Sequence, residues 1–132
     1  MTILRFESED FDVHDLLFEF QQTPLPDGVT VAVNQSAIAT KDERTIYVDI
    51  LEVASRIDVN EELLRLILTS AVTFGFVKIK NLIFAKPYIL LRFRNKASRK
   101  IEYDKGDAAI VEELMGYIEK GDVESVVFKS KS

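Results

Sequence analysis

The segment from residue 58 to residue 75 constrains the fold more than any other part of the sequence. Its apolar residues recur at helical spacing and cover nearly the whole circumference of a helix, namely Leu63, Leu64, Leu66, Ile67, Leu68 and Ala71. Asp58 and Glu61 have the spacing of a capping box at its start, and Gly75 is predicted to end it. A helix that is apolar on most sides is expected to be buried on more than one side.

Short apolar or alternating runs elsewhere in the chain predict strands. These runs cover residues 3–7, 29–33, 45–53, 76–80, 82–85, 88–94, 100–104 and 124–128. With two further helices, their order predicts a single α+β domain, whose mainly antiparallel sheet of five or six strands has two or three helices packed on one face. The domain is expected to span residues 1–128, and residues 129–132 are expected to form a flexible tail.

The two other helices are predicted around residues 13–20 and from residue 107 to residue 120. The first helix is indicated by the helical spacing of Val13, Leu16, Leu17 and Phe20, with Asp10 or Asp12 as its cap. The same segment also fits a strand, because Leu16, Phe18 and Phe20 alternate with other residues. We prefer the helix. In the second, Asp107 is predicted as the cap and Gly121 as the residue after the last turn. Gly116 costs about 1 kcal/mol relative to Ala inside a helix, so it indicates a close contact with a neighbouring element.

Residues 88–94 and 100–104 are predicted to pair as a hairpin. The preferred register stacks four apolar side chains on one face and puts charged pairs on the other, with Phe93 opposite Ile101, Leu91 opposite Tyr103, Arg94 opposite Lys100 and Arg92 opposite Glu102.

Composition excludes several classes of protein. The chain has 132 residues, no Cys and one His, which removes disulfide frameworks, Cys-ligated zinc, iron–sulfur clusters, thiol nucleophiles and sites with several His ligands. No secretory signal is recognisable. The uncharged run over residues 66–77 is 12 residues long, too short for a bilayer span of about 20 residues. We therefore expect a soluble cytoplasmic protein without membrane contacts.

Charge is unevenly distributed along the chain, whose net charge is −5. Residues 78–105 carry nine basic and two acidic residues, a net charge of +7, and the remainder carries −12. Such segregation predicts a two-sided surface, with the cationic hairpin and the anionic N-terminal segment in separate exterior regions. The alternative is that the two blocks pair with each other in the fold.

No motif points to catalysis. The sequence lacks a Gly-x-Ser-x-Gly elbow, and the glycine spacing at Gly116 and Gly121 lacks the Lys and Ser/Thr of a phosphate loop. His14 is the only side chain that ordinarily titrates near neutrality, but spacing places no nucleophile beside it. Asp49 and Glu52 would point to opposite faces of their strand. The chain is therefore predicted not to be an enzyme.

No metal or cofactor is predicted either. The densest acidic residues are Glu9, Asp10, Asp12 and Asp15. They lack the Gly and Glu positions of a calcium loop, and they suit the N-terminus of a helix through the helix dipole.

The basic stretch is the strongest candidate for binding. If the faces of strands 76–80 and 88–94 coincide, cations and aromatic rings interleave as they do on sheets that hold single-stranded nucleic acid. The candidate binding residues are Lys78, Lys80, Tyr88, Arg92, Arg94, Lys96, Arg99 and Lys100. Binding of single-stranded nucleic acid through this face is the alternative function.

The preferred function is a small non-enzymatic protein-interaction module, such as an adaptor, inhibitor or accessory subunit. It would dock a protein partner or a second copy of itself as a homodimer. Six aromatic residues exceed what a small two-layer core hides and are candidates for a contact patch: Phe11, Phe18, Phe74, Phe76, Phe84 and Tyr88.

Overall fold

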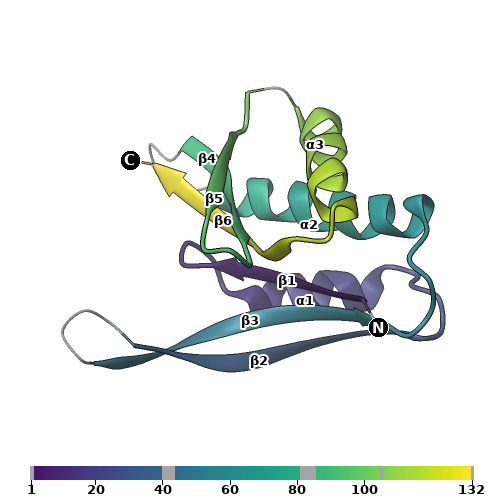
Figure 1. Ribbon diagram of the computed structural model, residues 1–132, viewed down its shortest axis with the longest axis horizontal. Coiled ribbons are helices and arrows are strands. Elements are labelled where there is room, and N and C mark those ends of the chain that lie inside the picture. The colour runs from purple at the N-terminus through teal and green to yellow at the C-terminus, as the bar shows by residue number, and fades with distance from the viewer. Residues whose placement is uncertain (1, 40–43, 81–85, 105, 132) are drawn as a thin grey trace.

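The structure, a computed structural model, describes residues 2–39, 44–80, 86–104 and 106–131. The elements follow one another as β1 (Thr2–Ser8), α1 (Val13–Gln22), β2 (Val29–Ala39), β3 (Thr45–Ser55), α2 (Glu61–Lys80), β4 (Lys86–Phe93), β5 (Ser98–Glu102), α3 (Asp107–Glu119) and β6 (Val123–Lys131). They form a single α+β domain, which confirms the predicted fold class (Figure 1).

All six strands belong to one sheet, in the order β2-β3-β1-β6-β4-β5. Strands β1 and β6 run parallel, and the other neighbours are antiparallel. One face packs against the three helices through the buried residues Leu4, Phe6, Leu51, Val53, Ile89, Leu91, Val126 and Phe128. Because side chains alternate along a strand, their neighbours in sequence point to the opposite face. No described helix covers that opposite face, which we call the open face.

Phenylalanine rings fill the centre of the core. The Phe128 ring of β6 lies 6.3 Å from the centroids of both Phe6 and Phe76. Gly75 of α2 faces the same ring, and a Cβ atom placed there would lie 2.7 Å from Cδ1 of Phe128. The close approach of α2 to β6 therefore requires a residue without a side chain at position 75.

Helix α2 continues past Gly75 to Lys80, so the predicted end at Gly75 and the predicted strand over 76–80 are both wrong. Phe76 and Ile79 fall on the same buried helix face as Val72, so the helical apolar spacing carries on through the glycine. The predicted strand over 82–85 lies outside the described residues.

Helix caps differ from the predictions at two of three positions. Asp12 caps α1 as predicted, by accepting a hydrogen bond from the backbone N–H of His14. Asn60, not Asp58, caps α2, because its Oδ1 accepts from the backbone N–H of Leu63 at 2.8 Å. The cap residue of α3 is Gly106, not Asp107.

Of the two glycines in and after α3, Gly121 behaves as predicted and Gly116 does not. Gly121 follows the helix with φ of 84°, as predicted for a residue in the left-handed region. A Cβ at Gly116 would meet nothing within 4 Å, so the predicted close contact at Gly116 is wrong. That contact is made by Gly75 instead.

The β4–β5 hairpin forms, but its predicted register is wrong. Tyr88 lies opposite Glu102, and Ile89 lies opposite Ile101. The turn is tighter than expected, since Phe93 N–H donates to the carbonyl of Ala97 at 2.9 Å and Lys96 takes a positive φ of 73°. The partner of each residue moves by an even number of positions, so the side chains that lie within β4 and β5 keep their predicted faces.

Strands β2 and β6 extend well beyond their predicted C-terminal ends. Strand β2 extends to Ala39 and pairs along its whole length with β3, whereas β1 pairs with β3 only over 51–55. The distal half of the β2–β3 hairpin is therefore a two-stranded arm, which reaches past β1 at the lower left of Figure 1. Strand β6 includes residues 129–131, which pair with 86–88, so the expected flexible tail is wrong for these residues.

Candidate functional site

The eight predicted binding residues do not form one surface. Tyr88, Arg92 and Lys100 lie on the open face, whereas Arg99 lies on the helix-covered face. Lys78 and Lys80 lie in the C-terminal turns of α2. Arg94 and Lys96 lie in the turn after β4. The interleaved surface expected from two strands is absent among the described residues, because residues 76–80 are helical.

Several of these bases pair with acids. Lys78 Nζ lies 3.5 Å from Asp15 Oδ2. Arg92 Nη1 lies 3.6 Å from Oε1 of Glu7, a largely buried residue. Since Asp15 and Glu7 belong to the anionic N-terminal segment, the expected separation of the cationic and anionic regions is wrong at these two contacts.

The middle of the open face is hollowed. A concavity of about 430 Å³ is lined there by residues that include Arg5, Glu7, Arg92 and Ser125. Arg5 Nε bonds Glu52 Oε1 at 3.3 Å, and Arg92 lies beside Glu7. The two arginines of this hollow are thus paired with carboxylates of the protein.

A second concavity, of about 550 Å³, lies where β4, β5 and β6 meet the end of α2. Lys100 Nζ and Lys131 Nζ contact the same Oε1 atom of Glu102, at 3.5 and 3.1 Å. The two ammonium groups also lie 4.6 and 5.8 Å from the centre of the Tyr88 ring. Lys86 is opposite Lys131 in the β4–β6 register and lines the same concavity. We call Lys86, Lys100 and Lys131 the lysine cluster.

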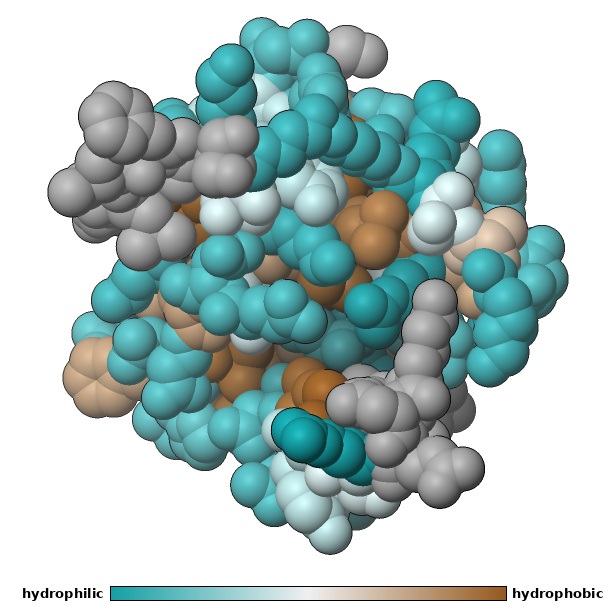
Figure 2. Space-filling view, turned by 90° about the vertical axis from the view of Figure 1, so that its left-hand side faces the viewer, coloured by the Kyte–Doolittle hydropathy of each residue, from teal (hydrophilic) through white to brown (hydrophobic). Residues whose placement is uncertain are grey.

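Crowding shifts the protonation of this cluster. Contact with the Lys131 ammonium lowers the pKa of Lys100. The hydrogen bond from Lys131 also lowers the pKa of Glu102. Two cations therefore share one carboxylate. Figure 2 shows this end of the molecule, where hydrophobic side chains lie in hollows between hydrophilic ones.

Sequence reasoning missed Lys86, Lys131 and Glu102 as site residues. Lys131 was assigned to a tail because the apolar run that ends at Phe128 is followed by the polar residues Lys129, Ser130 and Lys131. The pairing of Lys131 with Lys86 of β4, which is distant in sequence, extends the strand to include it.

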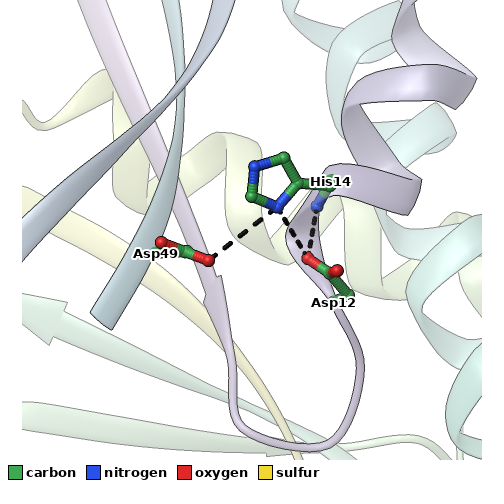
Figure 3. Close-up of side chains that lie close together, drawn as sticks. All are labelled: Asp12, His14 and Asp49. Carbon is green, nitrogen blue, oxygen red and sulfur yellow. Dashed lines mark hydrogen bonds and ion pairs between the residues drawn. The ribbon is translucent and has the colours of Figure 1, made fainter. Parts of the chain in front are cut away.

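A third group brings together Asp12 and His14 of α1 and Asp49 of β3 (Figure 3). Nδ1 of His14 lies 2.8 Å from Asp12 Oδ1 and 3.8 Å from Asp49 Oδ2. The hydrogen bond to Asp12 raises the pKa of His14, and the backbone N–H of His14 is the main cause that lowers the pKa of Asp12. Two carboxylates and one imidazole suit a divalent cation, but the helix cap and the His–Asp hydrogen bond already account for the geometry.

The aromatic residues proposed as a contact patch divide between core and surface. Phe76 is buried, and Phe11 and Phe74 pack against the core. Phe18 is 63% exposed on α1, and Phe84 lies outside the described residues. On the β2–β3 arm, Tyr47 and Ile46 are exposed as well, at 69% and 45%.

The outer edge of β2 is the longest free edge of the sheet. No described strand pairs with it. The strand reads VTVAVNQSAIA and contains no charged residue and no proline. Its pairing with β3 is continuous over all eleven residues, without a bulge. Natural edge strands are usually protected by charges, prolines, bulges or short length, and β2 has none of these protections.

No protein-family model, curated protein sequence or solved structure matches this chain. None of the described helices combines the length and the apolar character needed to cross a bilayer.

Proposed function

We propose that this chain is a small non-enzymatic protein-interaction module that docks an extended protein segment, or a second copy of itself, along the outer edge of β2. The unprotected edge of β2 is the observation that supports the proposal. Addition of a strand to a free edge is a common mode of protein recognition, in which main-chain hydrogen bonds give affinity and alternate side chains give specificity.

The edge offers enough backbone to hold a partner. In an antiparallel pair, alternate residues direct N–H and C=O groups to the same side, so about five of the residues of β2 present both groups outward. Each hydrogen bond that an added strand forms contributes about 0.5–1.5 kcal/mol net. Because β2 carries no charge, a second copy of β2 would approach it without like-charge repulsion between the paired strands.

Side chains on the arm extend the contact surface. Val31 and Val33 are half-buried on the helix-covered side of β2, while Ala32 and Asn34 are exposed on the open side. Ile46 and Tyr47 are exposed on β3, in the neighbouring part of the arm. An added strand would cover apolar surface on both faces of the sheet, which adds to the main-chain bonds.

The proposal is tested by placing charge on the edge. The double variant Ala32→Lys and Asn34→Lys puts two cations on β2, and Gln21→Lys with Gln22→Lys puts the same charge on the exposed end of α1 as a matched control. Sedimentation equilibrium from about 1 to 100 µM measures self-association. Affinity capture from the host, with nuclease treatment, measures binding to other proteins.

We expect self-association or a captured protein to be lost with the edge variant and kept with the control. Self-association that is absent in the unmodified chain, together with a capture profile that the edge variant leaves unchanged, would contradict the proposal. Circular dichroism of both variants shows whether each remains folded.

A further inference from the structure

We propose that the concavity around the lysine cluster binds the phosphate groups of a small anion, such as a di- or triphosphate. The inference is independent of the proposed docking at β2, because it concerns the opposite part of the sheet. It rests on the gathering of three lysines from three strands beside one hollow.

The cations converge from distant parts of the chain. Lys86 begins β4, Lys100 lies in β5, and Lys131 ends β6. The β4–β6 register places Lys86 directly opposite Lys131, while Lys100 and Lys131 meet at one carboxylate oxygen of Glu102. Lys80 of α2 lines the same hollow and lies 3.1 Å from the hydroxyl oxygen of Tyr103.

Positive charge exceeds negative charge at this place. Three lysines, namely Lys80, Lys86 and Lys131, line the concavity against two acids, Glu102 and Asp104, and Lys100 adjoins it. The molecule as a whole carries −5, so general attraction for anions is weak and binding has to come from the local cluster. An anion between the ammonium groups would relieve the repulsion that crowds Lys100 against Lys131.

The arrangement favours phosphate over a nucleobase. The ammonium groups of Lys100 and Lys131 lie near the Tyr88 ring at 4.6 and 5.8 Å from its centre, and Lys80 lies 4.2 Å from the centre of Tyr103. Rings that already have cations beside them are poorly placed to stack on bases. Lysine ammonium groups are compact point charges that bind phosphate oxygens without a fixed geometry.

Substitution of Glu102 and substitution of the lysines are expected to change the affinity for the anion in opposite directions. The carboxylate of Glu102 competes with a bound anion for the same two ammonium groups, so Glu102→Gln should tighten binding, whereas Lys131→Gln and Lys86→Gln should weaken it. Lys120→Gln is the matched control, since Lys120 also lies over a tyrosine ring, 5.5 Å from the centre of Tyr117, but in a different part of the fold.

The experiment is a titration of the full chain with sodium tripolyphosphate, followed by ¹H–¹⁵N NMR and calorimetry at low and moderate salt. We expect each lysine variant of the cluster to weaken binding about fivefold, the effect of one charge at about 4 Å in a water-rich site. Glu102→Gln should tighten binding by a similar factor, and Lys120→Gln should leave it unchanged. Shifted amide signals should centre on Tyr88 and Glu102.

Three results would overturn the inference. They are absence of tripolyphosphate binding at low salt, an equal loss with Lys120→Gln, and weaker binding by Glu102→Gln. A parallel titration with a dT oligonucleotide separates the sources of phosphate. Binding of the oligonucleotide without binding of tripolyphosphate would replace the small-anion site by a nucleic-acid surface.

Discussion

Replacement of Gly75 by Ala is expected to destabilise the protein, although Ala favours helices. The new Cβ would lie 2.7, 2.8 and 3.2 Å from Cδ1, Cε1 and Cγ of Phe128. That ring is fully buried and packs against Phe6 and Phe76, so it has little room to move. Overpacking of a core costs about 1–3 kcal/mol, and Ala regains about 1 kcal/mol of helix propensity. We expect a net loss of about 1–2 kcal/mol in the free energy of unfolding, since three ring atoms are contacted at once.

Gly116→Ala is the matched control, because Gly116 is also inside a helix but a Cβ there meets nothing within 4 Å. It should raise the free energy of unfolding by about 1 kcal/mol. Urea unfolding followed by circular dichroism measures both changes. In a Phe128→Leu background, the cost of Gly75→Ala should shrink because the clashing ring is gone. Stabilisation by both glycine substitutions would refute the argument that Phe128 selects glycine at position 75.

Three further predictions concern caps, ion pairs and pH. Asn60→Ala should lower the free energy of unfolding by about 1 kcal/mol in the same urea assay, since the cap of α2 is lost; a change near zero would contradict the assigned cap. Arg92→Ala should cost about 1–3 kcal/mol because it leaves the carboxylate of Glu7 buried without its cation, and adding Glu7→Gln should recover most of the loss. The pKa of His14 is raised in the folded state, so the contribution of its protonated form is complete below pH 6.5 and is lost as the pH rises through the folded pKa. An NMR titration of this single imidazole should give a pKa above 6.5, and Asp12→Asn, which keeps a capping side chain, should lower it.

The elements that sequence reasoning predicted correctly carry their signals locally. Helix α1 has its apolar stripe and its Asp12 cap within one short segment, and α3 ends at Glu119, just before Gly121 takes a positive φ. Strand β3 forms over Thr45–Ser55, but its buried residues Leu51 and Val53 lie on the face opposite to Ile46, Val48 and Ile50. In α1, spacing along the chain decides both the element and its buried face.

The errors arise where the local sequence is compatible with two structures and a contact with a distant residue decides between them. Gly75 has the sequence pattern of a helix end, but the Phe128 ring, 53 positions away in sequence, is what requires the glycine. The β4–β5 register depended on a turn whose tight form needs a positive φ at Lys96. Asp49 meets His14 only because β3 and α1 pack together. None of these contacts has a local signal.

The strand order makes the two proposed sites separable. Strand β2 is one edge of the sheet, whereas the lysine cluster lies on β4, β5 and β6, with β3 and β1 in between. Substitutions at distant sites without shared partners have effects that add. Ala32→Lys with Asn34→Lys should therefore leave the affinity for tripolyphosphate unchanged, and Lys131→Gln should leave self-association unchanged. If one substitution altered both measurements, the sites would be linked through the sheet or through a change in folding, and thermal unfolding of that variant would distinguish the two.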